Sequence, residues 1–387
     1  MDPDRRAASA VFDGPPPGDP AWTPPHCPWD ACPSRRGAPF RWRRHGAFRR
    51  AAAPRLVRRY RCLACGRTFS DQTFSGAYFA KRPEILAPLA NALVNGAALR
   101  QAARGLACAR STAVRAADRL GRLAALATAR LLAGLAVAGP VAHDDFVTFA
   151  LRRPLAVFLG TAVDPATDLV LALSAAPGIQ GGRRTPAQRR RLPALRAALP
   201  RAARRRAFRA LLEGLLDRLP PGARLELRTD DDRVYRDVVG RVGAGRVDHR
   251  VHPAPRRGRA DPAYNRALGP ANALHRFLRH ADAEHRRRPL AFARRVASCA
   301  GRAALFAFWR SFVQRRREGR NGGPTPAMLA GLADRPLSWD DLLGRRIFRR
   351  EIARLPDVAA RVLARAFPTP GAKDSPRLFP KHWLALA

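Results

Sequence analysis

The spacing of apolar positions divides the chain into a helical part and a part built from short strands. From Arg82 to about Leu135, alanine, leucine and valine recur every three or four residues, which predicts helices. A second helix is expected at Leu99–Gly105, followed by a turn at Leu106–Arg110. A third helix is expected from Ser111, a residue type that favours the N-cap position. Helices joined by a tight turn are typical of a helix-turn-helix motif.

The residues of the second and third helices agree with such a motif. Small side chains would let the two helices approach closely, namely Ala102, Ala103 and Ala107. Three arginines at helical spacing are expected on the outer face of the third helix, where a recognition helix contacts DNA: Arg115, Arg119 and Arg122. A plain three-helix spacer in an alanine- and arginine-rich chain is the alternative interpretation.

Beyond Gly139 and Pro140 the pattern changes to short apolar runs, which predict strands. The expected strands are Val141–Ala150, Leu155–Val163, Leu169–Ser174, Arg224–Thr229 and Val247–Val251. The expected helices are Leu192–Leu219 with a break at Pro200, Val234–Val239, and a long stretch from about Pro270 to Gln314 interrupted at Pro289. Three strands, helix, strand, helix, strand, helix is the order of the RNase H-like fold, a mixed α/β sheet.

The sequence therefore predicts a multidomain chain. Its expected parts are a disordered proline-rich tail at 1–25, a zinc ribbon at 26–75, an all-α helix-turn-helix segment at 80–138, an α/β RNase H-like catalytic domain at 140–318, and a loop-rich C-terminal tail with one or two short helices at 319–387.

Four of the six cysteines form two close pairs. Cys27 and Cys32 have the spacing C-x4-C, and Cys62 and Cys65 have the spacing C-x2-C. Two turns that each present two thiolates can supply the tetrahedral ligand set of a structural zinc ion. Four unrelated buried thiols, or a redox-active C-x2-C, are the alternatives.

The charge balance indicates a class of partner. With 72 basic and 30 acidic residues, the chain has a formal net charge of +42 at pH 7. Nucleic acid is the expected polyanion, and a membrane surface is less favoured because the arginines are spread along the chain. The most apolar stretch, Leu123–Val141, contains Arg130 and Pro140, and the N-terminus lacks the apolar core of a signal peptide. A cytoplasmic, nucleoid-associated protein is expected.

Acidic residues are scarce, so their clusters are informative. Asp144 and Asp145 lie within the first expected strand, and three aspartates follow the fourth: Asp230, Asp231 and Asp232. In an RNase H-like sheet these two positions are neighbours, and their carboxylates can bridge two Mg²⁺ ions about 4 Å apart. The alternative is a set of solvated turn acids with a helix N-cap at Asp232.

Several strings occur in an order that resembles a known family. They are CPWDAC, YRCLACGRTFSDQTF, HDDFVTF with RPLAV, RTDDD, ANALHRFLRHADAEHRRRPLAFARR and GGPTPAMLAGLADRPLSW. Together they resemble bacterial insertion-sequence transposases of the DDE class that carry an N-terminal zinc ribbon and helix-turn-helix. The resemblance covers nearly all of residues 25–350.

The resemblance implies a catalytic set. The family's first aspartate falls on Asp144, with Asp145 where the family commonly has glutamate, and the second falls on Asp230. The third position, glutamate in some branches and asparagine in others, falls on Asn272 at the head of the long expected helix. The acidic alternatives at this third position are Glu284 and Asp282, and the alternatives for the other catalytic aspartates are Asp145 and Asp231. Arg276 and Arg279 follow Asn272 on its helix face, where they would clamp phosphates or be solvated.

The function implied is that of a mobile-element transposase with structural zinc and catalytic Mg²⁺. Its zinc ribbon and helix-turn-helix would bind double-stranded DNA at terminal inverted repeats. The protein would act as a homo-oligomer on element ends and target DNA. One rival is a non-enzymatic DNA-binding protein, either a regulator or a decayed transposase. Another is an RNase H-type nuclease that hydrolyses DNA without strand transfer.

Overall fold

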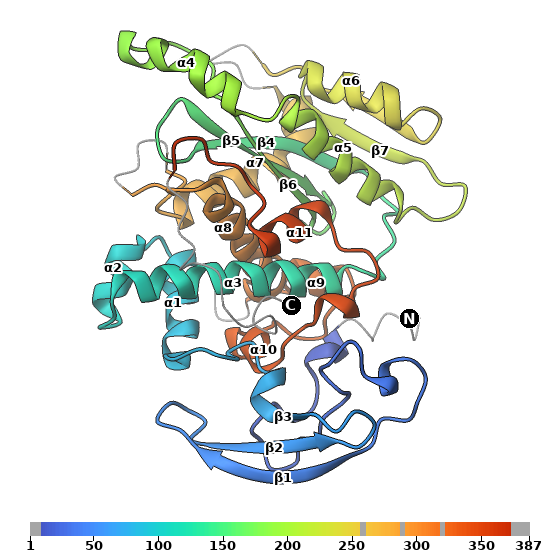
Figure 1. Ribbon diagram of the computed structural model, residues 1–387. Helices are drawn as coiled ribbons and strands as arrows, with labels where there is room; N and C mark the ends of the chain where they lie inside the picture. The colour runs from blue at the N-terminus through green and yellow to red at the C-terminus, as the bar shows by residue number, and fades with distance from the viewer. Residues whose placement is uncertain (1–8, 256–260, 287–290, 318–321, 373–387) are drawn as a thin grey trace.

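The computed structural model describes residues 9–255, 261–286, 291–317 and 322–372. Two sheets lie at opposite ends of the molecule, and helix α3 (Arg110–Leu131) crosses between them (Figure 1). The mixed α/β content agrees with the prediction. None of the helices within those ranges is long and apolar enough to span a membrane.

The N-terminal sheet, as described, has three antiparallel strands in the order β1-β2-β3. They are β1 (Trp42–Arg49), β2 (Leu56–Cys62) and β3 (Thr68–Ser70). An aromatic cluster forms its core, in which Trp22, Tyr60, Phe69 and Phe74 pack on one another. Phe12 is also buried, against the helices. Phe12 and Trp22, which lie in the stretch expected to be disordered, therefore pack on the rest of the chain, and residues 1–8 lie outside the described part.

The helical segment follows the predicted pattern closely. Its helices are α1 (Leu86–Val94), α2 (Leu99–Gly105) and α3. Helix α2 has the predicted bounds, whereas α3 begins at Arg110 with Ala109 in the N-cap position, so Ser111 lies inside the helix. The turn between α2 and α3 places Ala107 at a φ of 45°, in the left-handed region.

The second sheet, among the described residues, has five strands in the order β6-β5-β4-β7-β8. The strands are β4 (Val141–Phe149), β5 (Leu155–Val163), β6 (Val170–Ile179), β7 (Leu225–Thr229) and β8 (Val247–Val251). The pairs β4–β5 and β5–β6 are antiparallel, and β4–β7 and β7–β8 are parallel. The predicted order of strands and helices is confirmed.

Helices cover both faces of this sheet (Figure 1). They are α4 (Pro186–Ala198), α5 (Ala203–Leu216), α6 (Arg233–Val242), α7 (Pro262–Ala281) and α8 (Val296–Phe308). On one face, Phe208 of α5 and Tyr235 of α6 pack against His143 of β4. On the other face, His275 of α7 packs against Phe146 of β4. Alternate residues of β4 therefore face different helices.

The helical segment and the second sheet share one hydrophobic core. Leu120 of α3, Val141 of β4 and Phe208 of α5 belong to the same cluster of buried side chains. Helices α3 and α8 touch backbone to backbone, because a β-carbon at Gly121 would lie 2.6 Å from the Gly301 carbonyl oxygen.

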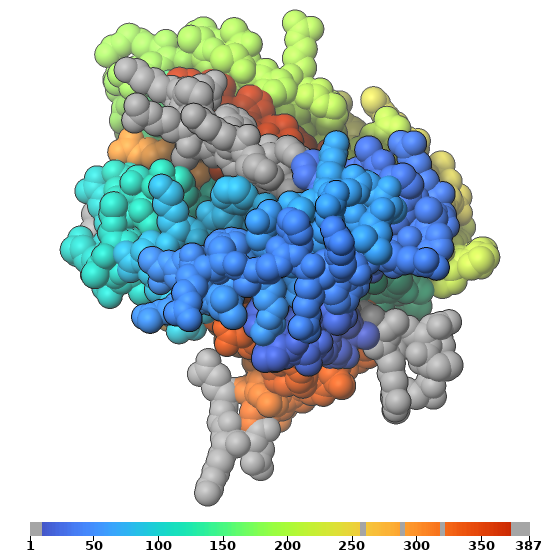
Figure 2. Space-filling model, turned by 60° about the horizontal axis from the view of Figure 1, so that its bottom comes forward, coloured from blue at the N-terminus to red at the C-terminus, as the bar shows by residue number. Residues whose placement is uncertain are grey.

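The C-terminal part is rich in loops, as expected, but has more short helices than the one or two predicted. It contributes three short helices within its described residues, α9 (Pro326–Leu329), α10 (Trp339–Gly344) and α11 (Asp357–Ala364). Phe348 lies in the aromatic core of the N-terminal sheet, against Phe74. Figure 2 shows the face of the molecule that the N-terminal segment covers.

Candidate functional site

The four paired cysteines converge on one point, as the sequence predicts. The ligand atoms of Cys27, Cys32, Cys62 and Cys65 all lie within 4.8 Å of one another. The Sγ atoms of Cys27 and Cys65 are 3.8 Å apart, and those of Cys32 and Cys62 are 3.6 Å apart. Four converging thiols with the spacing of two turns fit a structural metal such as zinc. This cluster can hold the metal ion that the sequence predicts.

Local geometry explains why the thiols meet. Cys62 ends β2, and Gly66 after Cys65 takes a φ of 71°, a left-handed conformation that favours glycine and lets the chain turn back to β3. Burial opposes ionisation of Cys32, but hydrogen bonds from Ser34 lower the pKa of its thiol to about 7. A thiol that ionises near neutral pH is a ready metal ligand.

The outer strand of the N-terminal sheet is exposed and strongly basic. Strand β1 lies at the sheet edge, and its residues from Arg43 to Arg49 are all exposed. Its arginines are Arg43, Arg44 and Arg49. An exposed, positively charged edge of this kind suits contact with phosphates.

The arginines expected on the outer face of α3 do not all lie there. Arg115 is exposed. Arg119 donates from Nη1 to the Gly76 carbonyl oxygen at 3.0 Å, and burial lowers its pKa to about 10. Arg122 is buried and its Nη2 lies 3.1 Å from an Asp118 oxygen. The prediction of an outer position is wrong for Arg119 and Arg122, because α3 turns that face toward the protein.

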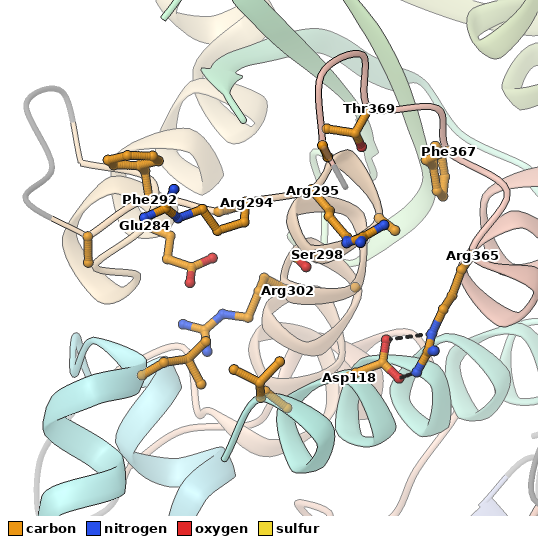
Figure 3. A pocket seen from close by; sticks show the side chains of 18 of the residues that line it. Asp118, Glu284, Phe292, Arg294, Arg295, Ser298, Arg302, Arg365, Phe367 and Thr369 are labelled. Atoms are coloured by element: carbon orange, nitrogen blue, oxygen red, sulfur yellow. Dashed lines mark hydrogen bonds and ion pairs between the residues drawn. The ribbon is translucent and has the colours of Figure 1, made fainter. Parts of the chain in front are cut away.

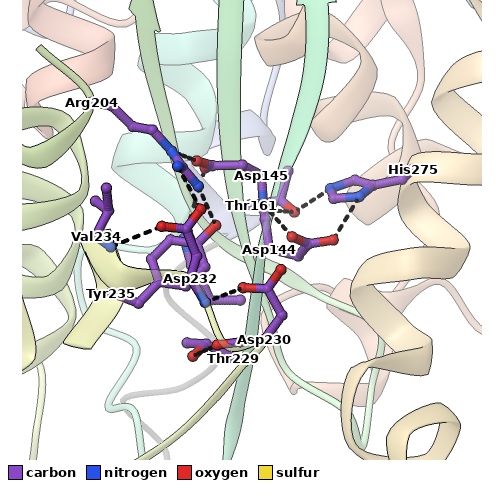
Figure 4. Close-up of polar contacts among 11 residues, drawn as sticks. Asp144, Asp145, Thr161, Arg204, Thr229, Asp230, Asp232, Val234, Tyr235 and His275 are labelled. Atoms are coloured by element: carbon purple, nitrogen blue, oxygen red, sulfur yellow. Dashed lines mark hydrogen bonds and ion pairs between the residues drawn. The ribbon is translucent and has the colours of Figure 1, made fainter. Parts of the chain in front are cut away.

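Asp144 and Asp230 come together at one edge of the second sheet (Figure 4). Asp144 lies on β4, and Asp230 directly follows β7, the parallel neighbour of β4. Burial and then the nearby Asp144 carboxylate raise the pKa of Asp230 to about 6. Two carboxylates that repel each other in this way form an electrostatic site for a cation.

Asp145 points to the opposite face of β4 from Asp144 (Figure 4). It pairs with Arg204 of α5, whose Nη1 also donates to Asp232 Oδ2 at 2.6 Å. Gly160, opposite Asp145 on β5, makes room for this pair, since a β-carbon there would lie 2.8 Å from Asp145 Oδ1. The structure thus places the alternative residue Asp145 in an ion pair away from Asp144.

The other two aspartates after β7 have structural partners. Asp232 caps α6 by accepting from the Val234 backbone N–H at 2.8 Å, and its own N–H donates to Asp230 Oδ1 at 3.2 Å. Asp231, also an alternative, is exposed and its Oδ1 lies 2.8 Å from Arg236 Nη2. The capping turn therefore orients Asp230, whereas Asp231 points to solvent.

The part of helix α7 that lies near the two carboxylates is its middle and not its N-terminal end. It begins at Pro262, so Asn272 lies well inside the helix, which continues through Pro270. Burial and the charges of Asp144 and Asp230 raise the pKa of Tyr264, and a hydrogen bond with Asn272 opposes them. Tyr264 thus lies within electrostatic reach of both carboxylates and is hydrogen-bonded to Asn272.

Two further α7 residues had been expected near phosphates. Arg276 is exposed, and Arg279 stacks over the Phe146 ring at 4.9 Å. His275, a residue that the sequence had not singled out, is buried, and its Nδ1 lies 3.5 Å from Asp144 Oδ2.

Glu284, the remaining acidic alternative, lies in a different group. It is buried past the end of α7, and its pKa is raised by burial. Arg302 binds the neighbouring Asp282 through two hydrogen bonds of 3.0 and 3.1 Å, and His285 lies 3.2 Å from Asp282. Glu284 and Arg302 line a cavity of about 1420 Å³ beside α2, α3 and α8 (Figure 3). Glu284 therefore belongs to the ion-pair cluster around Arg302 and Asp282.

Comparison with known proteins adds no relative. No protein-family model matches the chain, and no curated protein is similar to it. The site must therefore be interpreted from its own geometry.

Three contact residues at the carboxylate site escaped prediction: Thr161, Arg204 and His275. Arg204 was hidden among the many arginines of its segment, and Thr161 and His275 lie in apolar runs. A histidine at the centre of an apolar helix face was the one available signal.

Proposed function

We propose that this protein is a DDE-class DNA transposase with an RNase H-like catalytic domain centred on Asp144 and Asp230. The observation that carries the proposal is the convergence of these two carboxylates on neighbouring parallel strands, close enough for Asp144 to raise the pKa of Asp230. A perturbed acid beside a like charge is a common mark of a functional site. The strand order and the helices on both faces support the same proposal.

Two features support DNA as the substrate. The net charge of +42 favours a polyanion, and the exposed arginines of β1 offer phosphate contacts at one end of the molecule. The cysteine cluster would hold zinc and so fix the sheet that presents β1. We expect the protein to bind terminal inverted repeats as a homo-oligomer, with Arg115 of α3 exposed toward DNA.

The carboxylates would hold divalent metal, with Mg²⁺ the ion expected from the resemblance. When bound, this metal activates the attacking hydroxyl and stabilises the leaving oxygen in phosphoryl transfer. Asp230 has to release its proton before it can serve as a ligand, so binding weakens as pH falls toward 6. Asp232 orients Asp230 through its backbone N–H, and Arg204 ties Asp232 to β4.

The proposal is tested by cleavage of a labelled duplex carrying the element end. Asp144→Asn and Asp230→Asn should each lower the rate at least about a hundredfold, since a metal-stabilised charge is worth several kcal/mol of barrier and 1.36 kcal/mol is a factor of ten. Asp231→Asn is the matched control and should cleave as the wild type does. Wild-type cleavage by Asp230→Asn would overturn the assignment.

One observation favours the rival, a DNA-binding protein without catalysis. Helix α7, which passes Asp144, carries no aspartate or glutamate, so an acidic triad is incomplete there. A wild-type protein that binds the element ends but does not cleave them in Mg²⁺ or Mn²⁺ would establish this rival. Cleavage of any duplex without preference or strand joining would instead indicate a nuclease.

A further inference from the structure

The cavity beside α2, α3 and α8 has two buried polar atoms without partners on its wall. Arg302 is 5% exposed, and its Nε and Nη2 bind Asp282. Its Nη1 has no hydrogen-bond partner among the described residues, and neither has Oε2 of Glu284, which is 7% exposed. Both residues line the cavity of about 1420 Å³. A buried polar atom without a partner is costly, so this donor and this acceptor are available to a ligand.

The Glu284 carboxyl and the Arg302 guanidinium are neighbours. Burial raises the pKa of Glu284 and the charge of Arg302 opposes this shift, so the two groups lie within electrostatic reach. Figure 3 shows both side chains on the same part of the cavity wall. A donor beside an acceptor fits the polar edge of a nucleobase, because each of the four bases carries an N–H donor next to acceptor atoms.

The rim of the cavity is basic. Arg100 and Arg104 lie one turn apart on α2, and Arg110 begins α3. All three line the cavity and are exposed, and none has an ion pair within the part of the chain that the structure describes. Arg294, also exposed, lies on the same side as Glu284 (Figure 3). Arginines that are not neutralised by acids bind phosphate, so the rim can hold the charged part of a ligand.

Apolar side chains complete the cavity. They include Val114 of α3, Val362 of α11, and the rings of Phe292 and Phe367. Pockets of about 300–1,000 Å³ hold drug-sized ligands, so this larger cavity has room for a base, a sugar and a phosphate. Apolar walls, a buried polar pair and a basic rim together match the three parts of a nucleotide.

We propose that this cavity binds a nucleotide, with the edge of its base on Arg302 Nη1 and Glu284 Oε2 and its phosphate on Arg100 and Arg104. Guanine suits the polar pair, since its N1–H and N2–H can donate to one carboxylate while O6 accepts from arginine. A free nucleotide and an unpaired nucleotide of a DNA strand offer the same chemistry. The inference goes beyond the proposed function, because it involves neither carboxylate of the proposed catalytic site.

The test measures dGMP binding to the full chain by equilibrium dialysis and deoxyguanosine binding by competition. Glu284→Gln should weaken both ligands at least about tenfold, because the amide loses the charge and one acceptor oxygen. Arg104→Gln should weaken dGMP about fivefold and leave deoxyguanosine unchanged, since deoxyguanosine has no phosphate. Arg206→Gln is the control, because Arg206 is exposed on α5 and does not line the cavity. Its affinities should be those of the wild type.

A second variant keeps the proposal falsifiable if Glu284→Gln does not fold. Ser298 is exposed and lines the cavity, so a tryptophan there takes up the space of the ligand and leaves the buried side chains in place. Ser298→Trp should weaken dGMP at least about tenfold. Unchanged affinity in Ser298→Trp, or in a folded Glu284→Gln, would overturn the site.

Two duplexes identify the source of the nucleotide, one with a single unpaired guanine and one fully paired. Tighter binding of the first, lost in Ser298→Trp, would show that the cavity takes up a nucleotide of a DNA strand. Binding of dGMP with equal affinity for the two duplexes would show that it takes up a free nucleotide. No dGMP binding at about 1 mM, together with no preference for the unpaired guanine, would leave water as the only occupant and overturn the proposal.

Discussion

The cysteine cluster and the carboxylate site hold like groups together in different ways. The four cysteine ligand atoms lie within 4.8 Å of one another, although the two pairs come from separate turns. Asp144 and Asp230 repel each other, and the pKa of Asp230 rises to about 6 as a result of burial and this repulsion. The thiols approach one another at hydrogen-bonding distance. The two carboxylates repel each other, and the paired backbones of β4 and β7 keep them near one another.

The hydrophobic cores around the cysteine cluster and the carboxylate site also differ. The cysteines lie in a small core of their own with five large buried aromatic side chains, Trp22, Tyr60, Phe69, Phe74 and Phe348. The carboxylates lie on strands whose apolar residues belong to two large cores: Val141 and Leu227 are in the core that holds Leu120 of α3, and Ala142 and Phe146 are in the core that holds Leu274 of α7. We expect the folding of the small core to depend on its metal. The part of the second sheet that holds Asp144 and Asp230 should be stable without a metal.

The largest effect is expected from removing one zinc ligand. Cys62→Ser should abolish zinc binding and unfold the N-terminal sheet, because a structural zinc site contributes several kcal/mol to folding. Metal analysis should show one zinc per chain in the wild type and none in the variant. Cys108→Ser, outside the cluster, should keep its zinc. Full zinc retention in Cys62→Ser would show that Cys62 is not a zinc ligand and that the small core does not depend on it.

The stability of the carboxylate site should instead depend on the close packing of strand β4 against β5. In Gly160→Ala the new methyl group would meet Asp145 and the Ser174 hydroxyl, so we expect about 1–3 kcal/mol of destabilisation from overpacking. Gly214→Ala in α5 is the control, because nothing lies within 4 Å of a β-carbon there. Denaturant unfolding measures the stability of both variants, and equal stability of the two would show that the sheet tolerates more strain at this position than we infer.

Asp230→Asn should stabilise the protein at pH 7 in buffer without Mg²⁺ or Mn²⁺. The folded-state pKa of about 6 exceeds the usual 3.8, so ionised Asp230 costs stability above pH 6 and nothing below pH 3.8. Solvent screening reduces the gain to about 1 kcal/mol. Thermal unfolding from pH 4 to 7 should show the gain of the variant growing with pH. A gain in stability that does not change with pH would argue against repulsion between Asp144 and Asp230.

The smallest effect is expected at Asn272. Asn272→Ala removes a neutral side chain that contacts Tyr264, so the cleavage rate should fall less than about tenfold. Asp144→Asn, measured in the same assay, provides the scale. A loss as large as that of Asp144→Asn would place Asn272 in the third ligand position that the resemblance implies.

Much of the fold could be predicted because its elements carry strong local patterns. The strands Leu155–Val163 and Val247–Val251 and the helix Leu99–Gly105 have their predicted bounds. The cysteine cluster was also predictable, since zinc ligands come in close sequence pairs.

Side-chain direction was harder to predict. The face of α3 that bears Arg119 and Arg122 packs inward, and helical spacing alone does not say which face is covered. His275 and Thr161 meet Asp144 only through tertiary packing, and Arg204 had no local mark.

The placement of Phe348 in the aromatic core of the N-terminal sheet has a consequence for synthesis on the ribosome. Next to it, Arg350 donates to the Pro28 carbonyl oxygen across 322 residues of chain. At elongation rates of about 10 residues per second, this stretch takes about half a minute to make. The N-terminal sheet therefore waits for a segment that is made much later before its core is complete. A nascent chain interrupted before Phe348 would expose Tyr60 and Phe74 to chaperones and proteases.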